Sequence, residues 1–263
     1  MSRLLLDPRN GVAFDVPTPL SSPSSYVIAS VPRSGSTLLA RLLWETELAG
    51  RPKEYLNPMQ LRDWEVRFGR GLSAWCHAQL SGAAVGALVG RAWTQARLGR
   101  HLERVQARRT VGGWFGLKLH HHHFLRYGRH AGLSRLLAVD RWVRIRREDR
   151  LGQAISWARA LQSGQWASWQ GPGHAPTYSR EAIRRRLVAI EVAEAGWDSV
   201  LADQAVHGVR YQALVDDPVA TVRGVLEWLD VPGATEVVVS PPPTRRQADA
   251  ETLRWRERWA AGD

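Results

Sequence analysis

The chain has 263 residues, an apolar fraction of 44% and a single cysteine, Cys76, which excludes an internal disulfide. No apolar run approaches the ~20 residues that span a bilayer, and no signal peptide is evident, so we expect a cytoplasmic protein without a transmembrane segment. The formal net charge of +11 suits an acidic ligand such as a nucleotide, a nucleic acid or an anionic lipid surface, although all but two of the 36 basic residues are arginines.

The N-terminal part of the chain predicts a lead-in followed by a strand, a turn and a helix. Residues 1–25 are rich in Pro and Ser and predict an extended lead-in to one domain of residues 26–263. The apolar run YVIASV, Tyr26 to Val31, is typical of a buried parallel strand. After the turn PRSGST, leucines recur at helical spacing and predict a helix that ends near Gly50.

Strands and helices alternate along the rest of the chain. The predicted strands are 114–119, 142–147 and GVRYQAL at 208–214. The predicted helices are a solvated arginine-rich helix at 97–109, a helix after the strand 142–147, a long helix at 179–202, a helix within 216–232 and a last helix containing Trp255 and Trp259. This order predicts a single α/β domain with a central parallel sheet flanked by helices.

The turn between the first strand and helix has the character of a phosphate-binding site. A helix N-terminus presents unpaired amides, to which Ser34, Gly35, Ser36 and Thr37 add donors and Arg33 adds a permanent cation. The same residues also fit a serine helix cap beside a surface arginine. The turn lacks the first glycine and the lysine of the Walker pattern G-x-x-x-x-G-K-[ST], which disfavours ATP chemistry.

Several segments, in order, resemble sulfotransferases of the trehalose 2-sulfotransferase family. They are PRSGSTLL, AGRPKEYLNP, FGLKL, RIRREDRLGQAISWARALQSGQW, YQALVDDPVATVRGVLEWLDV and RRQAD with LRW, from Tyr26 to about Trp259. The resemblance implies an enzyme that uses 3′-phosphoadenosine-5′-phosphosulfate (PAPS), with the 5′-phosphosulfate on the turn Arg33 to Thr37. No carboxylate cluster suggests a magnesium site, so we expect no metal.

The resemblance also implies a second anion site, for the 3′-phosphate, made by an arginine and a serine. Ser156 is the serine, and we favour Arg147 as the arginine, although strand alternation leaves Arg146 open as the alternative. Asp149 in the same segment fits a helix cap better than direct chemistry. Gln153 fits a buried polar residue that satisfies nearby backbone.

Two further segments carry candidates for donor binding and catalysis. The resemblance places Arg245, Arg246 and Gln247 in a C-terminal segment that closes over PAPS; without it they fit a basic surface turn. It implies Glu54 as the general base that takes the proton of the acceptor alcohol. Lys118, at the family's G-x-K-L position, is a further catalytic candidate, with a structural lysine as the alternative.

The surroundings of Glu54 leave the acceptor open. Arg51 stands where the family's G-E-P version has an acidic residue. Lys53 could neutralise an anionic acceptor or pair with Glu54.

Four consecutive histidines, His120 to His123, follow the strand 114–119. Strand alternation would send His120 and His122 to one side and His121 and His123 to the other. No cysteine pair or carboxylate motif completes a zinc site. One of these histidines could instead contact the acceptor or serve as an alternative base.

These observations favour a PAPS-dependent sulfotransferase acting on a hydroxyl of a carbohydrate, a glycolipid or a glycosylated small molecule. Trp157, Trp166 and Trp169 could line a sugar platform. A phosphate-loop kinase or nucleotide hydrolase is an alternative, disfavoured by the missing lysine and magnesium ligands. A nucleic-acid-binding protein is another, disfavoured because the arginines are spread along the chain and no binding module is recognised. Members of the resembling family can be dimers, so we expect a homodimer.

Overall fold

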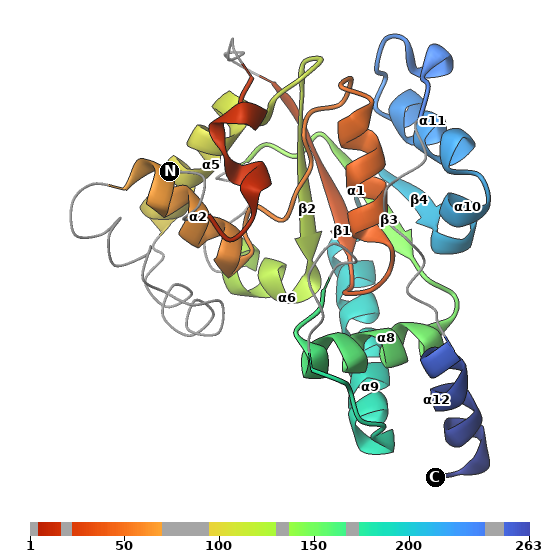
Figure 1. Ribbon diagram of the computed structural model, residues 1–263. Coiled ribbons are helices and arrows are strands. Elements are labelled where there is room, and N and C mark those ends of the chain that lie inside the picture. The colour runs from red at the N-terminus through yellow and green to blue at the C-terminus, as the bar shows by residue number, and fades with distance from the viewer. Residues whose placement is uncertain (1–4, 17–22, 70–94, 130–136, 167–173, 240–249) are drawn as a thin grey trace.

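The computed structural model describes residues 5–16, 23–69, 95–129, 137–166, 174–239 and 250–263 (Figure 1). Within these residues, four parallel strands form one sheet in the order β2-β1-β3-β4. The strands are β1 (Ser24–Ser30), β2 (Trp114–His120), β3 (Arg141–Arg146) and β4 (Val206–Arg210). The expected α/β domain with a central parallel sheet is confirmed.

The apolar run of β1 is buried on both sides of the sheet. Tyr26 and Ile28 belong to one core cluster, and Val27 and Ala29 belong to the other, as the alternation of a strand requires. A strand that is covered on both faces needs such a nearly continuous apolar sequence. Because β1 lies between β2 and β3, its C-terminal residue, Ser30, lies between the ends of these two strands, at the carboxyl edge of the sheet.

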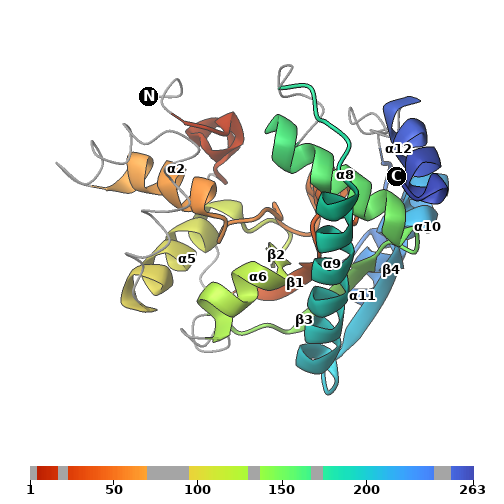
Figure 2. The same cartoon turned by 90° about the horizontal axis from the view of Figure 1, so that it is seen from below.

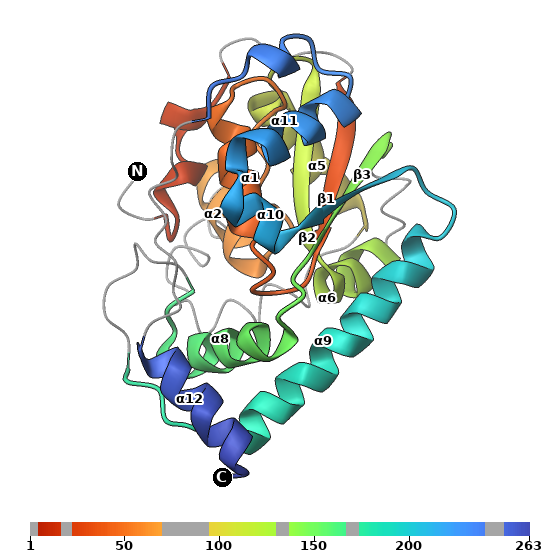
Figure 3. The same ribbon diagram turned by 90° about the vertical axis from the view of Figure 1, so that its right-hand side faces the viewer.

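Helices cover the two faces and the carboxyl edge of the sheet (Figures 1, 2 and 3). One face is covered by α1 (Ser36–Glu45), α10 (Tyr211–Asp216) and α11 (Pro218–Trp228). The other core cluster includes side chains of α2 (Pro58–Phe68), α5 (Gln95–Arg109), α8 (Arg150–Ser163), α9 (Arg180–Leu201) and α12 (Ala250–Ala261). The short helix α6 (His121–His123) follows β2 directly, and the strands run toward α6, α8 and α9. No helix in the described ranges combines the length and apolar character that crossing a membrane requires.

The described part of the lead-in is not extended. Pro8–Asn10 and Val12–Phe14 form 3₁₀ helices, and Asn10 is fully buried. The carboxylate of buried Asp63 on α2 explains this, since it accepts hydrogen bonds from the amides of Leu6 and Asp7, both at 2.9 Å, and from Asn10 Nδ2 at 2.8 Å. A buried carboxylate requires such donors, so the segment 5–16 packs as part of the fold.

Three other expectations about elements need correction. The segment GVRYQAL is a strand only to Arg210, after which α10 begins at Tyr211. The arginine-rich helix α5 is not simply solvated, because Leu98, Leu102 and Val105 form a buried stripe at helical spacing. Helix α2 was not predicted, although Asn57 caps it by accepting from Met59 N at 3.0 Å and Pro58 occupies its first position.

Candidate active site

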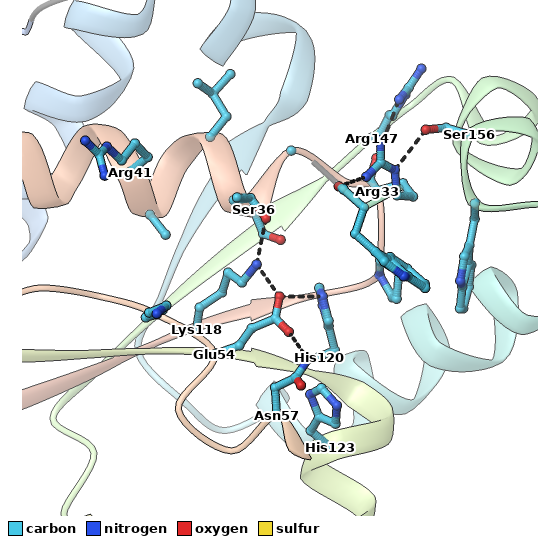
Figure 4. Close-up of a pocket in the computed structure, with 18 of the residues that line it drawn as sticks. Arg33, Ser36, Arg41, Glu54, Asn57, Lys118, His120, His123, Arg147 and Ser156 are labelled. Carbon is cyan, nitrogen blue, oxygen red and sulfur yellow. Dashed lines mark hydrogen bonds and ion pairs between the residues drawn. The ribbon is translucent and has the colours of Figure 1, made fainter. Parts of the chain in front are cut away.

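A cavity of about 1140 Å³ lies beside the carboxyl ends of β1, β2 and β3. Among the residues predicted for the site, its lining includes Arg33, Gly35, Ser36, Thr37, Glu54, Lys118, Arg147 and Ser156. Trp157 and Trp166 also line it. Arg245, Arg246, Gln247 and Trp169 lie outside the described residues. Figure 4 shows the residues around Glu54 and Arg33.

The turn from β1 to α1 is held in a conformation that few sequences allow. Arg33 and Gly35 have positive φ angles of 66° and 90°. A Cβ on Gly35 would lie 2.4 Å from the ring of Tyr211, so a side chain there meets both strain and a clash. In the described structure no side chain caps α1, which leaves the amides of its first turn for a ligand rather than for the serine cap considered above. The hydroxyl of Ser34 is buried and has no hydrogen-bond partner among the described residues.

Two arginines and a serine gather beside this turn. Arg33 Nε donates to Ser156 Oγ at 2.9 Å, and Arg33 Nη1 donates to the carbonyl of Trp166 at 2.6 Å. Arg147 Nη1 lies 3.5 Å from the carbonyl of Arg33, and its guanidinium stacks 4.8 Å from the centre of the Tyr211 ring. Burial and the charge of Arg147 lower the pKa of Arg33 to about 10, so the Arg33 guanidinium carries its charge at neutral pH.

Of the two adjacent arginines, it is Arg147 that faces the cavity. Arg147 lines it, whereas Arg146 pairs with Asp198 and, at 3.3 Å from its Nε, with Glu194, both on α9. Strand β3 ends at Arg146, so the direction of Arg147 is set by the loop that follows and not by strand alternation.

Two predictions for the same segment are confirmed. Asp149 caps α8 by accepting from Gly152 N at 2.9 Å, and it also pairs with Arg256. Gln153 is buried, and its Nε2 donates to the carbonyl of Pro32 at 2.9 Å. Gln153 therefore holds the chain just before the turn that carries Arg33.

Glu54 forms a second polar cluster that lines the same cavity. Its Oε1 pairs with Lys118 Nζ and lies 3.2 Å from His120 Nε2, while its Oε2 accepts from Asn57 Nδ2 at 2.8 Å (Figure 4). The loop is fixed to β2 because Lys118 N donates to the carbonyl of Lys53 at 2.9 Å. Lys118 Nζ also donates to Thr37 Oγ1 at 2.8 Å, so one ammonium group connects Glu54 with the first turn of α1.

The charges around Glu54 decide its protonation state. Burial raises the pKa of this carboxyl, but the positive charge of Lys118 and contacts with His120 outweigh it and hold the pKa well below its usual range. Glu54 is therefore ionised at neutral pH.

Lys53 does not pair with Glu54. Its Nζ donates to Asn10 Oδ1 at 2.7 Å and pairs with Asp7 Oδ2 at 2.9 Å, both in the N-terminal segment. Burial lowers the pKa of Lys53 to about 7, against the charge of Asp7, which raises it. Of the two roles considered for Lys53, pairing with Glu54 is wrong.

Comparison with known proteins identifies the family. The family model described as Stf0 sulphotransferase matches residues 25–262. This chain belongs to the Stf0 sulfotransferase family. Trehalose 2-sulfotransferase of Mycobacterium tuberculosis is 25% identical over 260 residues, covering 90% of this chain and 94% of that protein. Trehalose 2-sulfotransferase of Mycolicibacterium smegmatis is 26% identical over 267 residues, with the same coverage of 90% and 94%.

The fold of this sulfotransferase also matches a solved structure. A sulfotransferase from Alicyclobacillus acidocaldarius superposes with a TM-score of 0.51 at 13% identity, covering 92% of this chain and 93% of that one. Family membership makes the chain a transferase and does not favour the kinase, hydrolase or nucleic-acid alternatives.

The histidine run of this sulfotransferase does not follow strand alternation. Strand β2 ends at His120, and His121 to His123 form the turn α6. The ring of His121 packs on Trp197, with centres 5.5 Å apart, whereas His122 and His123 gather beside His120. Burial lowers the pKa of His122 to about 4 and that of His123 well below its usual value. No group of three potential metal ligands occurs in the described ranges.

Sequence reasoning missed Asn57 as a partner of Glu54 and did not single out His120 from its neighbours. The Asn-Pro pair at 57–58 is a helix-start signal that could have identified the loop ending at Asn57. No comparable signal separates His120 from the next three histidines, because the chain turns there.

Proposed function

We propose that this chain is a PAPS-dependent sulfotransferase that transfers a sulfuryl group to a hydroxyl of a carbohydrate-containing acceptor, with Glu54 as general base. One observation carries the proposal. Lys118 contacts both Thr37, in the anion-binding turn, and Glu54, so the turn and a carboxylate face one cavity at hydrogen-bond distance from the same ammonium group.

The residues of the turn fit an anionic donor. The uncapped first turn of α1 offers amide donors, Ser36 and Thr37 line the cavity beside it, and Gly35 allows the positive φ that the turn requires. When bound, PAPS supplies the sulfuryl group and a phosphate leaving group. Arg33 and the amides of residues 34–37 would stabilise the charge that develops on the leaving phosphate, and because they are fixed in the fold they need little rearrangement.

A second cation supports recognition of a 3′-phosphate. Arg147 and Ser156 lie next to Arg33 but belong to the β3–α8 connection and to α8, so they extend the positive surface beyond the turn. We assign the 3′-phosphate to this pair. Arg245, Arg246 and Gln247 remain predicted to close over the donor.

Glu54 is suited to take the proton of the acceptor. As the acceptor oxygen bonds to sulfur, its O–H bond breaks and the proton passes to the carboxylate, while the electron pair of the broken sulfur–oxygen bond leaves with the phosphate. Lys118 places its positive charge on the donor side of Glu54. A lysine in this position can neutralise the leaving phosphate without a metal ion.

A carbohydrate acceptor is supported by relatives and by the cavity lining. The two curated relatives are named trehalose 2-sulfotransferases. Trp157 and Trp166 line the cavity, and aromatic faces pack well on the C–H surfaces of sugars.

The setting of the enzyme is part of the proposal. We propose that it acts in the cytoplasm as a homodimer, consistent with one cysteine in the chain. Light scattering after size-exclusion chromatography measures the oligomeric state, and a monomeric mass would contradict the dimer.

The donor is tested first by calorimetry with 3′-phosphoadenosine-5′-phosphate (PAP), ADP and ATP, with EDTA present throughout. We expect selective binding of PAP that does not depend on a metal. Transfer of labelled sulfate from PAPS to trehalose and other glycosides then tests the acceptor class. The proposal would be overturned if the protein showed no preference for PAP and bound ATP only when magnesium was added in place of EDTA.

A further inference from the structure

His120 lies between two strands and the loop that carries Glu54. In the β1–β2 pairing it stands opposite Ser30, where both strands end. Its Nδ1 is 2.9 Å from Ser30 Oγ and its Nε2 is 3.2 Å from Glu54 Oε1, with the ring at Glu54 visible in Figure 4. The residue is 8% exposed and Ser30 is fully buried, so strand backbone and packing fix the ring.

The contact with Glu54 fixes the direction of one of these hydrogen bonds. An ionised carboxylate only accepts, so His120 Nε2 carries a proton and donates it to Glu54 Oε1. On the other side of the ring, Nδ1 contacts the hydroxyl of Ser30, which also lies 3.2 Å from the carbonyl of Leu119.

We propose that His120, anchored on Ser30, is a positioning residue that orients Glu54 for proton transfer, an inference that rests on the proposed function. A carboxylate offers about four lone-pair positions. Lys118 and His120 occupy Oε1 and Asn57 contacts Oε2, which leaves a lone pair of Oε2 to receive the acceptor proton.

His120 and Lys118 hold Glu54 in different ways. Lys118 has a flexible stem and also contacts Thr37, so its ammonium group is shared with the donor side of the cavity. The His120 ring is held at both nitrogens and has no contact with the turn 33–37 among the described interactions. His120 therefore keeps the carboxylate in place when Lys118 turns toward the donor.

The other titratable groups around His120 do not compete for this role. His122 and His123 pack against its ring, with centres 5.7 and 5.9 Å away, and Lys118 pairs with the same carboxylate oxygen of Glu54. Burial keeps His122 and His123 neutral at neutral pH. Glu54 is thus the anion that the His120 ring faces.

Two substitutions separate positioning from a structural role. In His120→Asn the amide can replace the contact of Nδ1 with Ser30 but not the donor to Glu54, whereas in His120→Gln the longer amide can reach Glu54. We expect His120→Asn to lower kcat by up to ~10²-fold, the cost of a misplaced catalytic group, with unchanged PAP affinity. His120→Gln should recover most of kcat. The matched control is His207→Asn, because that ring packs on Trp228 and is not among the residues that line the cavity, so kcat should be unchanged.

A double-mutant cycle shows whether His120 acts through Glu54. The variant Glu54→Gln/His120→Asn should be no slower than Glu54→Gln alone, because a carboxylate that is absent cannot be misplaced. The proposal would be overturned if the loss of kcat in the double variant equalled the product of the losses in the two single variants. The proposal would also be overturned if His120→Asn and His120→Gln lost kcat equally and in proportion to their drop in melting temperature.

The ring assignment is tested without turnover by ¹⁵N NMR of histidine-labelled protein, with the His120 signals assigned from their absence in His120→Asn. We expect Nε2 to carry a proton at neutral pH, and Glu54→Gln to shift the Nε2 signal more than that of Nδ1. An unprotonated Nε2 would overturn the inference. If PAPS transfers nothing to any glycoside, the proposed function fails, and the NMR result still reports separately on the contact between His120 and Glu54.

Discussion

The two walls of the cavity are built from different chemistry. The donor wall consists of the turn 33–37 with Arg147 and Ser156, whose charges are guanidinium groups and whose other donors are amides and hydroxyls. The proton wall consists of Glu54, Asn57, Lys118 and His120, from a loop and the end of β2. The donor wall keeps its charge at any ordinary pH, while the proton wall depends on groups that set one another's protonation.

The sharpest test of this division is Glu54→Gln. Removing the carboxylate should lower kcat by ~10²–10⁴-fold, the usual contribution of general base catalysis, and leave PAP affinity unchanged because the donor wall is intact. Steady-state kinetics and calorimetry measure the two effects. Glu227→Gln, on the exposed face of α11, is the matched control. If Glu54→Gln kept full turnover, Glu54 would not be the general base.

A smaller effect on the donor wall is expected from Arg147→Ala. Hydrogen bonds to charged groups contribute ~1.5–3 kcal/mol, so PAP affinity should fall roughly 10- to 100-fold, while AMP, which lacks the 3′-phosphate, should lose little. The neighbouring Arg146→Ala is the control, since Arg146 pairs with α9. Equal losses of affinity for PAP and AMP would show that Arg147 does not bind the 3′-phosphate.

The shape of the donor wall is tested by Gly35→Ala against Gly164→Ala. Both glycines have positive φ, which costs an L-residue about 1–2 kcal/mol, but a Cβ meets the Tyr211 ring at Gly35 and open space at Gly164. We expect both variants to lose stability in denaturant unfolding. Only Gly35→Ala should also lose PAP affinity, by about tenfold if the cost in binding is near 1.4 kcal/mol. Similar PAP binding by both would show that the turn tolerates a side chain.

His123, whose ring packs against His120 of the proton wall, should add a modest pH dependence to stability. The pKa of His123 in the fold is well below that of a histidine in the unfolded chain. Below about pH 6.5 the unfolded state therefore binds more protons, and the stability of the fold decreases as the pH is lowered. His123→Asn should reduce this slope by at most about 1.4 kcal/mol per pH unit, measured by urea unfolding at several pH values. Arg147→Ala, on the donor wall, should leave the slope unchanged.

The donor wall could be predicted from the sequence because its parts are local. An apolar strand, a turn of small polar residues and a leucine-rich helix follow one another in 20 residues or so, and each has its own physical signature. Glu54 and Lys118 were predicted through family resemblance alone, since nothing in KEY or GLKL shows a shared contact.

The remaining features depend on contacts between distant segments. The imidazole of His120 gains its role from Ser30, 90 residues away, and from a turn that ends strand alternation. The packed N-terminal segment depends on Asp63, 53 residues from Asn10. Composition shows Pro and Ser before the first strand, but it does not show that a carboxylate on α2 accepts hydrogen bonds from the amides of Leu6 and Asp7.

The hydrogen bonds between Asp63 and the N-terminal segment affect where the chain can be truncated for laboratory use. The family match begins at residue 25, which invites a truncation just before β1. Such a truncation would remove Asn10 and Asp7, which are the side-chain partners of buried Lys53, and would leave Asp63 with Arg62 as its partner. A buried amine without a partner is costly, and Lys53 directly precedes Glu54, so we expect the shortened protein to be less stable next to its active site.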